Sequence, residues 1–192
     1  MRIIFLLFCF CLSVENGIAQ TPVGFPDTPS ITEKSVGRAQ IGMTLAKLKV
    51  LYPGCTFTPT HLARYGFDDY DSKPNGVTVS YGKQKLFVYF SDWQTRKKIV
   101  CLIALHPAYQ TVQGIHVGST SGQLKAKLPA IKVVPNMIMQ DIEIAFVGEN
   151  SDLSTNYVFF RQGNVGKYVV ADEPVRITAL NAKISWIQVY PH

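Results

Sequence analysis

Apolar and polar residues follow the same order twice along the chain. In residues 41–59 and again in residues 117–135, an apolar residue and a glycine precede a threonine and then leucines at helical spacing. The two stretches align without a gap at an offset of 76 residues, so that Gly42 meets Gly118 and Thr44 meets Thr120. Threonine hydroxyls accept hydrogen bonds from the free N–H groups that begin a helix, so both threonines are predicted N-caps. The pattern indicates a duplicated unit.

Strand-like segments follow each predicted helix. Alternating or nearly continuous apolar runs occur three times after the first helix and three times after the second, with turn residues between them. These predicted strands are residues 77–81, 86–90 and 99–105 in the first repeat, and residues 142–147, 157–161 and 184–190 in the second. The expected fold class is therefore α+β, with two tandem units, each a short helix packed on a 3–4-stranded antiparallel sheet.

The start of the chain is typical of an exported protein. Residues 1–19 combine a basic start, an apolar run too short to span a bilayer comfortably, and small residues before Gln20, which predicts a cleaved signal peptide. The proline-bearing residues 20–34 are expected to be a flexible linker, followed by a first repeat unit at 35–110 and a second at 111–192. We expect a secreted or periplasmic protein with no membrane span after cleavage.

The charge of the chain bears on its partner, and its cysteines bear on a possible disulfide. The formal net charge is +6, but Lys and Arg are scattered and only Arg96–Lys98 forms a run, so no nucleic-acid partner is expected. Two cysteines lie outside the predicted signal. Cys55 alternates with threonine directly after the first helix, which also predicts a strand there, and Cys101 lies in the predicted strand 99–105. In an oxidising compartment they either form a disulfide or remain as two buried thiols.

Catalytic and metal signatures are missing from the sequence. It contains no paired histidines at zinc spacing, no Gly-x-Ser-x-Gly elbow and no phosphate-binding glycine loop, so no cofactor or metal is expected. Asp69 and Asp71 fit the first positions of a calcium loop, but Lys73 and Ser80 stand where further ligands are needed. Asp141 and Glu143 share one face of a predicted strand, where such pairs are more often solvated than catalytic.

Aromatic residues give the best indication of a binding surface. In the run 86–90, alternation places Phe87 and Tyr89 on one face and three other apolar residues on the opposite face. An aliphatic core face would leave these two aromatic side chains partly exposed, and exposed aromatics are suited to protein contacts. The predicted binding surface consists of Tyr65, Tyr70, Phe87, Tyr89 and Trp93.

The two repeat starts resemble those of known envelope proteins. Tandem units that open with Ile41-Gly42-Met43-Thr44 and with Val117-Gly118-Ser119-Thr120 look like the beta-lactamase-inhibitor-protein-like fold, and the first is also similar to the start of the SmpA/OmlA envelope lipoproteins. The resemblance implies exported proteins whose sheet surfaces bind other proteins without catalysis or cofactors. Ser119 departs from the pattern, where methionine is usual, and the inhibitor activity itself is not carried over.

These observations predict an exported, non-catalytic binding protein with an unknown protein partner in the envelope or outside the cell. One alternative is an envelope hydrolase that uses scattered carboxylates, namely Asp69, Asp71, Asp141 or Glu143. Another is a structural component of the envelope.

Overall fold

The computed structural model describes residues 25–68, 73–148, 155–170 and 173–190. The predicted signal peptide, residues 1–19, and the site candidates Asp69, Tyr70 and Asp71 lie outside the described residues. Within the described ranges, none of the helices has the length and apolar character that crossing a membrane requires.

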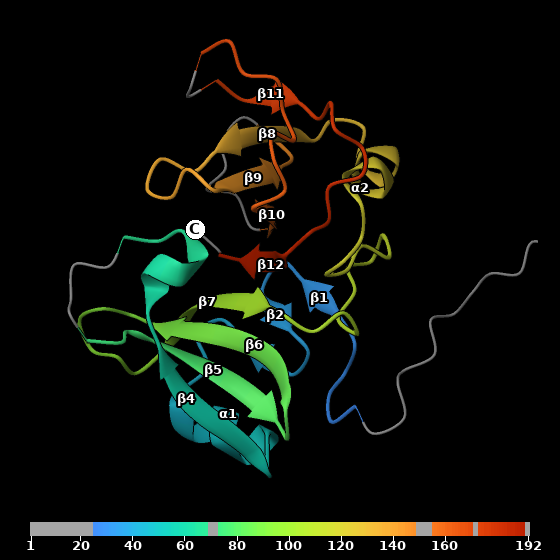
Figure 1. Ribbon diagram of the computed structural model, residues 1–192. Helices are drawn as coiled ribbons and strands as arrows, with labels where there is room; N and C mark the ends of the chain where they lie inside the picture. The colour runs from blue at the N-terminus through green and yellow to red at the C-terminus, as the bar shows by residue number, and fades with distance from the viewer. Residues whose placement is uncertain (1–24, 69–72, 149–154, 171–172, 191–192) are drawn as a thin grey trace, which may run out of the picture.

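A nine-stranded antiparallel sheet forms most of the molecule (Figure 1). Its order is β11-β8-β9-β10-β12-β7-β6-β5-β4. The strands are β4 Cys55–Thr60, β5 Gly76–Tyr81, β6 Gln84–Ser91, β7 Ile99–Ala104, β8 Lys132–Pro135, β9 Ile142–Phe146, β10 Thr155–Phe160, β11 Val175–Arg176 and β12 Trp186–Val189. A second, three-stranded sheet contains β1 Ile31–Thr32, β2 Ser35–Val36 and β3 Ala39–Gln40.

The prediction of two tandem helix-on-sheet units is wrong, and the fold is mostly β. β7 pairs directly with β12, with Leu102 opposite Val189 and Ala104 opposite Ile187, so both halves of the chain share the large sheet. The strand that closes each repeat would otherwise expose a row of unpaired backbone groups. Pairing the two closing strands with each other removes both edges.

The two predicted helix starts are confirmed. The helices are α1 Leu45–Leu51 and α2 Ser121–Lys127, and a 3₁₀ turn spans Leu62–Tyr65. Thr44 Oγ1 accepts from Lys47 N at 3.3 Å and Thr120 Oγ1 accepts from Gln123 N at 3.1 Å, as expected for N-caps. The same backbone geometry therefore occurs at both ends of the sheet, although the sheet itself is continuous.

The large sheet has a helix face and a second face. The helix face packs against Leu48 of α1 and Leu124 of α2, and strand residues such as Phe87, Tyr89 and Leu102 lie in this core. The second face carries a smaller core that is covered in part by the segment from Leu62 to Phe67. Its buried members are Val88, Phe90, Cys101, Ile103, Ile142, Val158 and Trp186. Both faces are therefore apolar in the middle of the sheet.

The described part of the expected linker, residues 25–34, packs against the fold. Phe25 stacks on His106 at a ring distance of 5.0 Å, and Ile31 is buried in the core of the helix face. The carboxylate of Asp27 has no exposed surface and accepts a hydrogen bond from the Tyr109 hydroxyl at 2.7 Å. From Phe25 onward, the chain is thus part of the folded structure rather than a spacer.

Cys55 and Cys101 are both free thiols. Cys55 lies on β4 and Cys101 on β7, and two further strands separate them in the sheet. Three strand spacings of about 4.8 Å place them roughly 14 Å apart, whereas the Cα atoms of a disulfide lie within about 7 Å. The disulfide alternative is therefore wrong. Burial raises the pKa of the Cys101 thiol, which makes this residue unreactive at neutral pH.

Candidate functional site

Two of the five predicted binding residues lie in the core. Phe87 is 0% exposed and Tyr89 is 2% exposed, and the ring of Phe87 contacts the ring of Tyr52 from the C-terminal end of α1 at 5.1 Å. The prediction that their face of the sheet is exposed is wrong. It assumed one covered face, whereas the nearly continuous apolar run of β6 is typical of a strand that is buried on both faces.

The other predicted binding residues do not join into one surface. Tyr65 is half-buried on the second face, where its ring packs edge-on against Trp186 at 5.4 Å. Trp93 lies in the loop between β6 and β7 and is 83% exposed. Tyr70 lies outside the described residues. The aromatic residues singled out by the sequence therefore mark two separate regions and part of the core.

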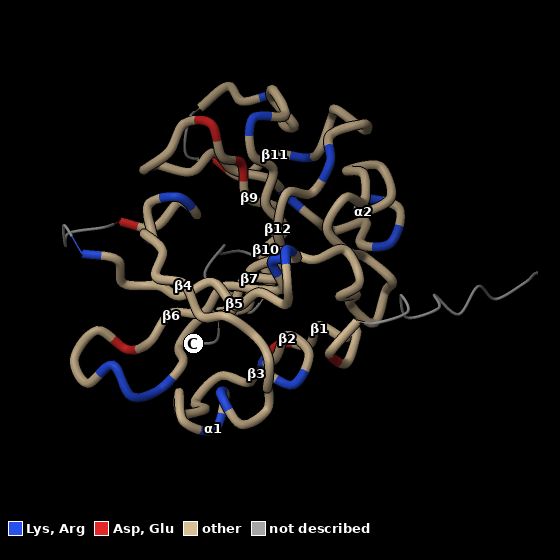
Figure 2. The backbone as a smooth tube through the Cα atoms, turned by 60° about the horizontal axis from the view of Figure 1, so that its bottom comes forward, with Lys and Arg blue, Asp and Glu red and all other residues tan. Residues whose placement is uncertain are grey.

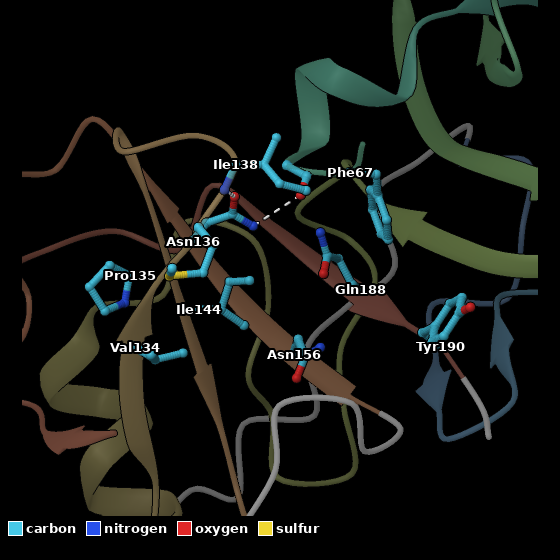
Figure 3. Close-up of a pocket in the computed structure, with 11 residues that line it drawn as sticks. Phe67, Val134, Pro135, Asn136, Ile138, Ile144, Asn156, Gln188 and Tyr190 are labelled. Atoms are coloured by element: carbon cyan, nitrogen blue, oxygen red, sulfur yellow. Dashed lines mark hydrogen bonds between the residues drawn. The ribbon is translucent and has the colours of Figure 1, made fainter. Parts of the chain in front are cut away.

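A groove of about 450 Å³ lies on the second face, over β9, β10 and β12 (Figure 3). Ile144, Asn156 and Gln188 form its floor, each on a different one of these strands. Asn156 and Gln188 are direct partners in the β10–β12 register, so their side chains project from the same face of the sheet on adjacent strands. The described residues that line the groove are Gly66, Phe67, Val134, Pro135, Asn136, Met137, Ile138, Ile144, Asn156, Gln188 and Tyr190.

A side-chain hydrogen bond joins two of the segments that line the groove. Asn136 Nδ2 donates to Gly66 O at 3.0 Å, drawn as a dashed line in Figure 3. Asn136 Oδ1 accepts from Ile138 N and Met139 N, which fixes the loop that follows β8. Gly66 has a φ of +83°, and a Cβ there would meet Asn136 Nδ2 at 2.9 Å. Glycine is required at this position by both the backbone conformation and the close approach.

Unpaired polar atoms gather on the same two strands. Gln188 Nε2 donates to Tyr65 O at 3.1 Å, so the other end of this amide, Oε1, faces the groove (Figure 3). Asn156 Oδ1 is buried and has no hydrogen-bond partner, and the same is true of Trp186 Nε1 on the neighbouring strand. Among the described residues these are the two buried side-chain polar atoms without a partner. Such atoms are rare in folded proteins, because a buried polar group without a hydrogen bond is costly.

Exposed apolar side chains surround the groove. Met137 is 73% exposed, Ile138 is 52% exposed and Tyr190 is 42% exposed, and all three line it. The described lining residues include no charged side chain. Clusters of exposed apolar residues around a cavity are typical of binding surfaces, whereas isolated ones are common on any protein.

The carboxylates considered for catalysis have structural partners. Glu143 is buried, and its carboxylate accepts from the backbone N–H groups of Val165 and Gly166 and from the Tyr168 hydroxyl. It is therefore not the solvated carboxylate that the strand pattern favoured. Asp141 forms an exposed ion pair with Arg161 at 3.1 Å. No cluster of three or more His, Cys, Asp or Glu side chains suited to a metal occurs among the described residues.

Basic residues are distributed over the whole described backbone. Figure 2 shows Lys and Arg on both helices, on several loops and beside the short strands, without one continuous patch. The run Arg96–Lys98 is one of these loops, where Asp92 accepts from the backbone N–H groups of Lys97 and Lys98 at 3.1 Å each. The backbone N–H and the hydroxyl of Thr95 also donate to Asp92, and these two hydrogen bonds, followed by those from Lys98 and Lys97, hold the pKa of the Asp92 carboxyl well below its usual range.

Sequence reasoning did not find the groove. Its clearest signal is the run Pro135-Asn136-Met137-Ile138, in which two large apolar residues follow a turn-forming pair. A second signal is the presence of Asn156 and Gln188 inside strands that are otherwise apolar. The residues behind these two signals can be recognised as parts of one site only when the order of the strands is known, because β8, β10 and β12 are far apart in sequence.

Comparisons with known proteins leave the family open. Neither a family model nor a curated protein sequence matches this chain. The similarity to the beta-lactamase-inhibitor-protein-like and SmpA/OmlA proteins therefore stays a prediction. Among solved structures, the fold is similar to that of the uncharacterized protein YfeY from Escherichia coli, with a TM-score of 0.45 and 14% sequence identity. The match covers 84% of this chain and 99% of the other.

Proposed function

We propose that the protein is an exported, non-catalytic binding protein and that the groove on the second face receives a protein partner. The observation that carries the proposal is the apolar rim formed by Met137, Ile138 and Tyr190 around a cavity that has the side chains of Ile144, Asn156 and Gln188 at its floor. Large exposed apolar side chains next to a pocket are typical of the central part of a protein interface. The proposed location, secreted or periplasmic, rests on the predicted signal peptide.

A protein fits this surface better than a small molecule alone. A small molecule held in the groove would leave the outer surfaces of Met137 and Ile138 in water, since these side chains are 73% and 52% exposed. A protein surface can fill the groove with one side chain and cover the rim with its neighbours. The apolar area at the rim is then removed from water, which favours association at about 25 cal/mol per Å².

Replacing Met137 with aspartate tests the proposal. We expect the mature chain, immobilised and exposed to an envelope extract of its source organism, to retain one protein, and the M137D variant to retain at least about tenfold less of it, because a charge on the rim becomes buried without a partner. Val112→Asp is the matched control, since Val112 is 93% exposed and does not line the groove. Both positions are on the surface, so both variants are expected to fold.

Two outcomes contradict the proposal. The first is equal retention of the protein by the M137D variant and the unchanged chain. The second is a stronger loss in the V112D control, which would place the interface near the first strand of the small sheet. Circular dichroism of each variant shows whether a loss of retention reflects a loss of folding.

A further inference from the structure

A second pocket, of about 340 Å³, lies in the first half of the chain, between the start of α1, the segment after β4 and the loop between β6 and β7. None of its described lining residues also lines the groove. Tyr89 and Trp93, which the sequence predicted to be binding residues, both line it. This pocket is therefore a separate candidate site.

Two hydroxyl groups without a partner line the pocket. Tyr89 and Ser91 lie two residues apart on β6, and neither side-chain oxygen forms a hydrogen bond with another residue. The unpartnered side-chain atoms that have no accessible surface are others, so the Tyr89 hydroxyl keeps some accessible surface although the residue is 2% exposed. Burial alone raises the pKa of Tyr89 to about 12, without a contribution from a hydrogen bond. Both hydroxyls can donate to a ligand and accept from it.

The formal charges of the described lining cancel. Asp92 and Arg96 are its two charged residues. The carboxylate of the first accepts hydrogen bonds from Thr95, Lys97 and Lys98 in its own loop. An ion that enters such a pocket loses hydration without meeting a net opposite charge, so the lining favours a neutral ligand.

An exposed indole ring adjoins the two hydroxyls. Trp93 is 83% exposed and lines the pocket, so most of its ring is in contact with water. Leu45, Pro59 and Val77 add aliphatic surface to the lining. A ligand with an apolar face can cover the indole ring and remove apolar area from water. The ligand that fits is neutral and has both an apolar face and hydrogen-bonding groups.

We propose that this pocket binds a neutral sugar ring with equatorial hydroxyls, whose C–H face packs on Trp93 and whose hydroxyls pair with Tyr89 and Ser91. In such a ring the faces consist of C–H groups, while each hydroxyl at the edge both donates and accepts. A pocket of about 340 Å³ is at the lower end of the range for ligand sites, roughly 300–1,000 Å³, and is suited to one or two rings. The site is additional to the proposed protein-binding groove.

The test measures acrylamide quenching of the tryptophan fluorescence of the mature chain, with cellotriose and with triacetylchitotriose as probes. The sequence contains two tryptophans, and Trp186 is 5% exposed, so acrylamide quenches mainly Trp93. We expect at least one of the sugars to lower the quenching by roughly half, because a ring on one face of the indole leaves the other face open. The expected dissociation constant is on the order of 1 mM.

Tyr89→Phe removes the hydroxyl and keeps the ring, so this variant is expected to fold. We expect it to bind the sugar at least about fivefold more weakly, since one hydrogen bond is lost. Tyr81→Phe is the matched control, because Tyr81 is 42% exposed and does not line the pocket. Near-UV circular dichroism shows whether each variant keeps its packing.

Three results would overturn the proposal. The first is that neither sugar changes the quenching at concentrations well above the expected dissociation constant. The second is equal affinity of the Tyr89→Phe variant and the unchanged chain, which would show that the hydroxyl is not recognised. The third is a loss of sugar binding in the M137D variant, which would place the sugar in the groove. Retention of the partner protein by the groove is measured separately, so either proposal can fail alone.

Discussion

Replacing Asp27 with alanine is expected to lower the free energy of unfolding by about 3–5 kcal/mol. The side chain of Asp27 has no exposed surface, and its carboxylate accepts from Arg38 Nε at 3.1 Å and from the hydroxyls of Tyr52 and Tyr109. Removing it leaves Arg38 Nε and two tyrosine hydroxyls without their acceptor. It also releases the segment after Phe25 from the sheet, and urea denaturation measures the combined loss.

Asp141→Ala is the matched control for this experiment. Asp141 also pairs with an arginine at 3.1 Å, but its side chain is 56% exposed. Exposed ion pairs contribute about 0–1 kcal/mol, so the control is expected to unfold at nearly the urea concentration of the unchanged protein. A loss below about 1 kcal/mol for Asp27→Ala would contradict the packing of residues 25–34 described above.

Raising the pH above about 10 is expected to destabilise the protein steeply. Burial raises the pKa of six tyrosines, and it raises the pKa of Tyr89 to about 12. The other five are Tyr52, Tyr65, Tyr109, Tyr157 and Tyr168. These hydroxyls stay protonated in the folded state, while in the unfolded chain they ionise near the ordinary value of 10.0. Their contribution to stability is therefore complete below pH 10 and is lost as the pH rises toward about 12.

The loss is at most about 1.4 kcal/mol per pH unit for each of these tyrosines, and less where solvent reaches the hydroxyl. Several together give a fall of several kcal/mol between pH 10 and 12, measured by urea denaturation at each pH. Tyr89→Phe removes one of the groups and is expected to make the fall less steep. A stability that stays constant up to pH 12 would contradict the burial of these hydroxyls.

Local features of the fold were predicted well from the sequence. The helix starts at Thr44 and Thr120 were found because capping depends on a few neighbouring residues, and the structure shows both caps. The strands in both repeats were also close to their observed positions, since alternation along a strand is a local property. The antiparallel arrangement of the strands is likewise confirmed.

The sheet arrangement was not predictable from these patterns. Pairing between β7 and β12 joins residues that are far apart in sequence, such as Leu102 and Val189, and nothing local distinguishes two sheets from one. The error about Phe87 and Tyr89 has the same origin. Their exposure depends on whether α1 and the small sheet cover that face of the large sheet. This depends on how the whole chain folds and not on the residues next to Phe87 and Tyr89.

The groove could not be predicted for a related reason. Asn136 and Gly66 both line it and are joined by a hydrogen bond from the asparagine side chain, yet they belong to different repeats of the sequence. Asn156 and Gln188 become neighbours only when β10 pairs with β12. A polar residue in an apolar strand can be either a satisfied core residue or part of a site, and only the position of Asn156 in the wall of the groove places it at the site.

Photo-cross-linking from position 137 in living cells tests most directly whether the groove is the binding site. A benzophenone amino acid is introduced in place of Met137 on the rim or, as the control, in place of Val50, which is 79% exposed on α1. We expect one cross-linked protein from position 137 and none, or a much weaker one, from position 50. Cross-links of equal strength from both positions, or from position 50 alone, would contradict the proposed site.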